Sequence, residues 1–198
     1  WVDPGTNMAV FSGAVYSRER AAFLQHAELR RILLHPPPRE AGTDLPKQFD
    51  DLHRELLDHL RNRKTVDAAI LSSYVNRLRA VRRGLFDCWL EGIRFGCASV
   101  NLPTIFKAYA GRVAESMAAG RPVISWEIPN RPRNRALFGE GEEILLFPRN
   151  EPVMLAHHIR RLQLDPALAR GLVESARKKI LTHPTSEVRI LQLLEWIA

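Results

Sequence analysis

The stretch over residues 101–147 decides the fold of this chain; it reads NLPTIFKAYAGRVAESMAAGRPVISWEIPNRPRNRALFGEGEEILLF. Its middle predicts a helix of mostly small residues over 111–119, closed by Gly120 where a helix-terminating glycine takes a positive φ. The short apolar runs at 122–126 and 144–147 are typical of buried strands. The stretch therefore predicts a helix followed by two short strands.

The rest of the chain continues this alternation. Short apolar strands are expected at 8–12, where the strand ends at Gly13, and at 31–35 and 97–102. A helix with Ser17 as its cap is expected from there to about Arg30. Three helices should finish the chain, from about Glu151, from Asp165 and over 185–197. Strands that alternate with helices predict an α/β fold with a parallel sheet and helices on both faces.

A helical segment at about 47–96 interrupts this pattern. Its apolar residues recur in steps of three and four, as they do on one side of a helix. The segment is long for one strand-helix unit. Two interpretations stay open: it replaces a strand-helix pair, or it is a helical insertion.

Composition narrows the classes of protein to consider. The chain has 198 residues, of which 45% are hydrophobic, so one compact domain over 1–198 is expected. The net charge of +7 suits nucleic acid, an anionic membrane surface or a phosphate-bearing ligand. No apolar run approaches the roughly 20 residues of a transmembrane span. Cys88 and Cys97 lack metal-ligand spacing, which favours a reduced, cytoplasmic chain. The chain opens on Trp1 with no signal-peptide pattern, and we expect an excised domain.

The segment RVAESMAAGRPVI at 112–124 resembles the nucleotide-sugar-binding half of GT-B glycosyltransferases, most closely the bacterial CgeB-like branch. The resemblance implies one Rossmann-like half of a GT-B fold. It also implies that Glu115 accepts hydrogen bonds from the ribose hydroxyls of the donor. A carboxylate suits this role because it can accept from two neighbouring hydroxyls at once. The alternative is a solvent-facing glutamate on an ordinary helix.

Several positively charged residues are candidates for the donor diphosphate. The Gly13 turn resembles the opening of the family's donor domain, where backbone N–H groups and a basic residue, here Arg18 or Arg20, face the phosphates. Many members have a glutamate eight residues before the ribose-binding one, whereas this chain has Lys107, a phosphate contact or a surface lysine. The donor-binding set is completed by Arg112, on the helix of Glu115, and by Arg131 and Arg133 in the expected loop 126–135.

The resemblance implies a domain that binds a nucleotide-diphosphate sugar, with the acceptor, unknown, bound by an N-terminal domain absent from this chain. No cofactor or metal is expected, because arginines and helix N-termini would stabilise the leaving diphosphate. The catalytic residues stay unknown, and the isolated chain should bind donor weakly and catalyse nothing. A regulatory or scaffold domain that kept the fold is one rival. Nucleic-acid binding through the basic helices at 54–83 is another, although no stacking platform or motif supports it.

Overall fold

The computed structural model describes residues 3–35, 44–63, 68–105, 108–182, 190 and 194–195. Within it the chain forms two compact units. The first, the sheet unit, comprises Trp1–Pro36 and Gly92–Ala198. The second, the hairpin unit, comprises Pro37–Glu91.

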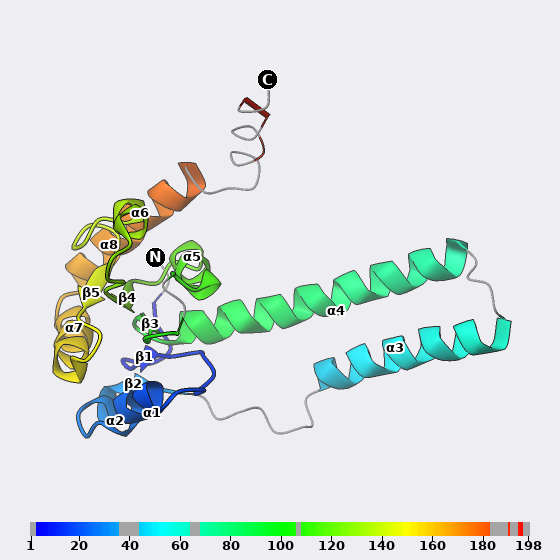
Figure 1. Cartoon of the computed structure of the whole chain (residues 1–198), viewed down its shortest axis with the longest axis horizontal. Coiled ribbons are helices and arrows are strands. Elements are labelled where there is room, and N and C mark those ends of the chain that lie inside the picture. Colours follow the sequence, from blue (N-terminus) through cyan, green and yellow to red (C-terminus); the bar gives the residue numbers. More distant parts are fainter. Residues whose placement is uncertain are drawn as a thin grey trace. The chain divides into compact units, whose positions relative to one another are not determined.

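The sheet unit is built on five parallel strands in the order β2-β1-β3-β4-β5 (Figure 1). They are β1 (Ala9–Val10), β2 (Leu33–Leu34), β3 (Ser99–Asn101), β4 (Val123–Trp126) and β5 (Leu145–Phe147). All pairings are parallel, so the predicted Rossmann-like α/β fold is confirmed. In sequence order, β2 pairs with one side of β1, and β3 then pairs with its other side. The strand order therefore reverses between β1 and β3, the place where ligands bind in open α/β sheets.

Helices cover both faces of this sheet, as predicted. The helices of the sheet unit are α1 (Arg18–Gln25), α2 (Leu29–Ile32), α5 (Gly111–Ala118), α6 (Pro132–Leu137), α7 (Pro152–Leu164) and α8 (Pro166–Thr182). Two predicted caps are confirmed. The Ser17 hydroxyl accepts from the Arg20 backbone N–H at 3.2 Å, and the Asp165 carboxylate accepts from the Leu168 N–H at 2.9 Å.

Three local predictions differ from the structure. The helix expected from Ser17 to Arg30 ends at Gln25, because His26 turns the backbone into the extended region, and α2 then shortens the strand expected at 31–35. The expected loop 126–135 contains the start of α6, where Pro132 occupies the first turn that its fixed φ suits. The helix expected over 185–197 falls almost wholly outside the described residues.

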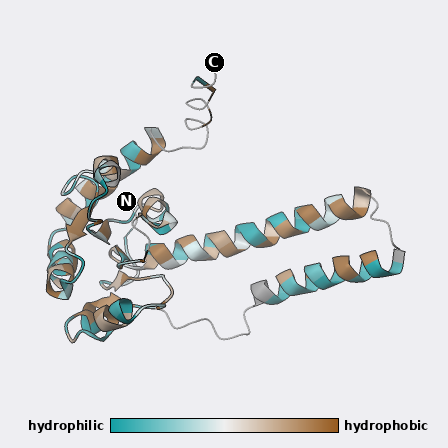
Figure 2. Ribbon diagram, viewed as in Figure 1, coloured by the Kyte–Doolittle hydropathy of each residue, from teal (hydrophilic) through white to brown (hydrophobic). Residues whose placement is uncertain are grey.

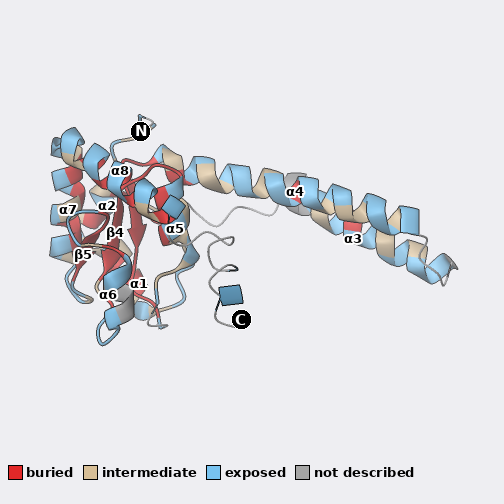
Figure 3. Ribbon diagram, turned by 90° about the horizontal axis from the view of Figure 1, so that it is seen from above, coloured by how far each residue is buried: buried red, intermediate tan, exposed pale blue. Residues whose placement is uncertain are grey.

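Each face of the sheet has its own apolar core. In β5, Leu145 and Phe147 point into a cluster with α1, α2 and α7, whereas Ile144 and Leu146 flank them on the side of α5 and the later part of α8. This alternation follows from the two-residue period of a strand. Figure 3 shows the strands as buried. The strands are therefore packed between two apolar layers.

The hairpin unit consists of two helices, α3 (Asp44–Arg63) and α4 (Ala68–Phe95), which run antiparallel (Figure 2). The last residues of α4 belong to the sheet unit. The predicted helical segment at about 47–96 is thereby confirmed. No helix in the described ranges is long and apolar enough to cross a membrane.

Gly120 ends α5 in the way its sequence position predicts. Its φ is +78°, in the left-handed region. The Gly120 N–H donates to the Met117 carbonyl at 3.1 Å, and the Arg121 N–H donates to the Ser116 carbonyl at 3.0 Å. This pair of hydrogen bonds is the Schellman motif, and it satisfies two carbonyls that the end of a helix leaves without partners.

We expect Gly120→Ala to lower the free energy of unfolding by about 1–2 kcal/mol, because a Cβ in the left-handed region meets the following carbonyl oxygen. Gly171, inside α8, is the matched control. Its added Cβ would meet nothing within 4 Å, so Gly171→Ala should stabilise by roughly 0.5–1 kcal/mol. Urea unfolding of both variants measures the difference. Shifts of the same sign would contradict this account of Gly120.

Candidate functional site

The carboxyl ends of β1 and β3 lie side by side at the reversal of the strand order. β1 continues into Phe11 and the Gly13 turn, while β3 continues into Leu102 and Pro103. Backbone carbonyls of these two loops are brought close together, and each one removed from water needs a hydrogen-bond donor. One arginine of α1 supplies donors to both loops.

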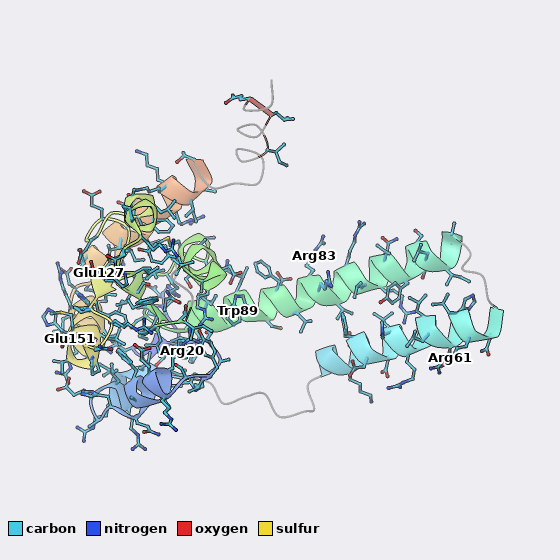
Figure 4. All side chains as sticks on the ribbon, viewed as in Figure 1. Arg20, Arg61, Arg83, Trp89, Glu127 and Glu151 are labelled. Atoms are coloured by element: carbon cyan, nitrogen blue, oxygen red, sulfur yellow. The ribbon has the colours of Figure 1, made fainter. Side chains whose placement is uncertain are left out.

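Arg20 fills this position (labelled in Figure 4). Its Nε donates to the Pro103 carbonyl at 2.7 Å, Nη1 to the Ala14 carbonyl at 2.7 Å and Nη2 to the Leu102 carbonyl at 3.3 Å. The residue is only 1% exposed, and burial lowers the pKa of its guanidinium. The guanidinium also lies 4.2 Å from the centre of the Tyr16 ring. Arg20 therefore positions the two loops, and we do not count it among residues that would touch a ligand.

Gly13 leaves room for a second arginine. A Cβ added to Gly13 would lie 2.0 Å from Nη1 of Arg112 and 2.6 Å from the Phe11 ring. A larger residue would therefore have to displace the guanidinium or the ring. On its other side, the Gly13 carbonyl bonds to Nε2 of His35 at 3.0 Å.

The Arg112 guanidinium is held close to the protein interior. Its Nη1 is buried and has no hydrogen-bond partner among the described residues. Burial lowers the pKa of the Arg112 guanidinium, and the nearby Glu115 carboxylate opposes this effect. A buried N–H group without an acceptor is costly, by about 1–3 kcal/mol. An anion that supplied an acceptor here would remove that cost.

Glu115 lies one helical turn after Arg112 on α5 and is half-buried. Its Oε1 would be 3.6 Å from a Cβ added to Gly111, so the carboxylate extends back toward the start of the helix. The neighbouring Ser116 donates to the Ser99 hydroxyl at 2.7 Å and fixes the rotation of α5 against the sheet. No side chain caps α5, since its N-cap residue is Ala110. The start of α5 thus presents N–H groups near both charged side chains.

The structure brings together Gly13, Arg112 and Glu115 out of the predicted donor-binding set. Arg18 is the exposed first residue of α1, and Arg131 is the exposed N-cap residue of α6; no described contact joins either of them to the Arg112 group. Lys107 and the side chain of Arg133 lie outside the described residues.

Sequence reasoning missed Tyr16 and His35. The His35 ring stacks on Phe11 with centroids 5.4 Å apart. The sequence could have indicated His35. A histidine that ends one strand lies at the same edge of the sheet as the glycine turn that ends the neighbouring strand. In the described ranges, no group of three or more His, Cys, Asp or Glu side chains is placed to hold a metal ion.

A family model described as glycosyl transferase-like matches residues 20–195. A search of curated proteins finds no match. Sucrose-phosphate synthase from Thermosynechococcus elongatus matches 98% of this chain and 45% of its own, with 20% identity and a TM-score of 0.56. TarM matches 94% of this chain and 28% of its own, with 14% identity and a TM-score of 0.48. The synthase likeness shows a shared fold, and this chain spans less than half the length of that protein.

We expect Arg20→Met to lower the free energy of unfolding by about 3 kcal/mol, because carbonyls of two loops lose a charged donor. Arg18→Met is the matched control on the same helix. Arg18 is exposed, so its substitution should change stability by less than about 0.5 kcal/mol. Urea unfolding compares the two variants, and equal effects would contradict the positioning role of Arg20.

Proposed function

The chain belongs to the glycosyl transferase-like family, and we propose that it is the donor-binding, C-terminal domain of a GT-B glycosyltransferase of the CgeB-like branch. It binds a nucleotide-diphosphate sugar at the carboxyl edge of the sheet. The acceptor binds to a separate N-terminal domain, and sugar transfer takes place between the two. By itself, this chain binds the donor weakly and transfers no sugar.

The observation that carries this proposal is the guanidinium of Arg112 over Gly13, with a buried Nη1 that lacks an acceptor. A diphosphate oxygen supplies that acceptor and a matching negative charge. The uncapped start of α5 adds N–H donors and the positive end of a helix dipole. As the sugar leaves, the same groups stabilise the charge that develops on the diphosphate.

Glu115 completes the site as the acceptor of the ribose hydroxyls. Residues three apart on a helix have Cβ atoms about 5–6 Å apart, so Arg112 and Glu115 can reach adjacent groups of one ligand. In a nucleoside diphosphate, the ribose is joined directly to the diphosphate. The cation and the carboxylate are therefore spaced for the two ends of that linkage.

A thermal-shift panel of nucleoside diphosphates and their sugars tests the proposal. A ligand at about 100 times its Kd stabilises a protein by about 2.7 kcal/mol, and for a chain of this length that raises Tm by roughly 5–10 °C. Arg112→Ala should lose the shift. Glu115→Ala should reduce it for the normal nucleotide, but should add no further loss for a 2′,3′-dideoxy nucleotide, which lacks the hydroxyls.

The matched controls are Arg177→Ala and Glu174→Ala, two exposed positions on α8 that should keep the full shift. A panel with no shift at all would instead favour the regulatory or scaffold domain, for which the lysine at 107 is the supporting feature. A shift that both site variants retain would place the nucleotide elsewhere on the fold.

A further inference from the structure

The two helices of the hairpin unit pack through one stripe on each. Leu52 and Val81 are the buried residues of this contact, 4% and 8% exposed. At one edge of the stripe, Arg77 and Glu55 form an ion pair across the hairpin with 2.7 Å between Nη1 and Oε2. A groove of about 180 Å³ lies along this edge, lined by Glu55, Ser73 and Arg77 and by apolar side chains that include Leu52, Leu56 and Ile70.

A second apolar stripe follows on the other flank of each helix. On α3 it contains Leu57 and Leu60, and on α4 Leu71 and Phe86, with exposed fractions of 39%, 38%, 48% and 49%. On both helices this stripe is displaced in the same rotational sense from the contact stripe. Because the helices are antiparallel, the same sense brings both stripes to one side of the hairpin. Together with the half-buried residues between them they form the apolar face: Leu57, Leu60, Leu71, Val75, Leu78 and Phe86.

Arginines accompany the apolar face. Arg82 lies within it, and Arg79 and Arg83 follow at the outer edge of α4; all three are exposed and none has an ion pair with another described residue. At the outer edge of α3, Arg54 and Arg61 pair with acidic residues of their own helix. Figure 4 labels Arg61 and Arg83 on the two helices. Five carboxylates lie on the opposite flank: Asp51, Glu55, Asp58, Asp87 and Glu91. Asp50, seven residues before Leu57, is the exception and lies on the same side of α3 as the apolar face.

We propose that the apolar face docks on an anionic lipid surface, with the hairpin lying parallel to it. Exposed leucines and a phenylalanine enter the boundary between headgroups and acyl chains, as in other basic amphipathic helices. The arginines at the rim extend their stems along the apolar surface and place their guanidiniums among anionic headgroups. The acidic flank faces away from the lipid.

The charge distribution selects this occupant over others. A second copy of the chain that met this face symmetrically would bring two sets of unpaired arginines together, which repel. The phosphates of a nucleic acid would pair with the arginines, but they would offer the exposed leucines no favourable apolar contact. A helix from a partner protein needs a groove to lie in. The groove beside the Glu55–Arg77 ion pair includes none of the residues of the apolar face.

Flotation of the full chain with vesicles tests the proposal. We expect binding to vesicles of phosphatidylcholine mixed with phosphatidylglycerol, weak binding to phosphatidylcholine alone, and weaker binding as salt rises. Phe86→Asp should reduce the partition coefficient by about tenfold or more. The double variant Arg82→Ala, Arg83→Ala should reduce it by about 30-fold, since each arginine near such a surface contributes about fivefold.

Matched controls separate the face from general charge. Ala80→Asp adds the same carboxylate on the opposite flank of α4, and Arg177→Ala with Lys178→Ala removes the same charge from α8; both should bind as the unchanged protein does. All substituted positions are exposed, and circular dichroism checks the fold. Absence of binding to the mixed vesicles would overturn the proposal. So would binding that the controls reduce equally, or self-association, measured by ultracentrifugation, that Phe86→Asp abolishes while vesicles stay unbound.

Discussion

Arg20 carries a guanidinium that is almost excluded from water and donates to backbone carbonyls in two loops that follow different strands. Removing a charged group from water is unfavourable, and here hydrogen bonds to the carbonyls of Ala14, Leu102 and Pro103 offset it. On the β3 side, Leu102 and Pro103 are 82 and 83 residues from Arg20 in the sequence. On the β1 side, Ala14 is six residues from it. One side chain therefore fixes the distance between the two loops where the strand order of the sheet reverses.

The Arg112 guanidinium lies at this same edge of the sheet. Arg20 and Arg112 both lie against the Phe11 ring, with their guanidinium carbons 5.4 and 5.5 Å from its centre. Burial is the main cause of the lowered pKa of Arg20, and the like charge of Arg112 adds to it. Arg20 is held by three backbone carbonyls, whereas the Arg112 guanidinium occupies the space that Gly13 leaves free. In the proposed donor site, a diphosphate would meet the Arg112 guanidinium already in position, so its charge would be stabilised with little reorganisation.

The sequence predicted the elements whose causes are local. Ser17 and Asp165 cap helices through neighbours three residues away, and Gly120 ends α5 through its own φ. Burial of an arginine has no such local cause. Arg18 and Arg20 are two residues apart on one helix, yet one is exposed and the other is buried because of β3, which lies far away in the sequence. The placement of Arg20 could be found only once the strand order was known.

The position of Glu115 depends on the core more than on its charged neighbours. Met117 and Val113 pack into the apolar cluster on the side of the sheet that α5 covers, and the Ser116 hydroxyl donates to the Ser99 hydroxyl on β3. These contacts fix the rotation of α5, so the side of the helix that carries the carboxylate is set before any ligand binds. A carboxylate that accepts hydrogen bonds from two neighbouring ribose hydroxyls needs this kind of support, because both bonds weaken when their angles are distorted. An exposed surface glutamate would need none. The packing of α5 therefore sets the position from which Glu115 would act in the proposed donor site.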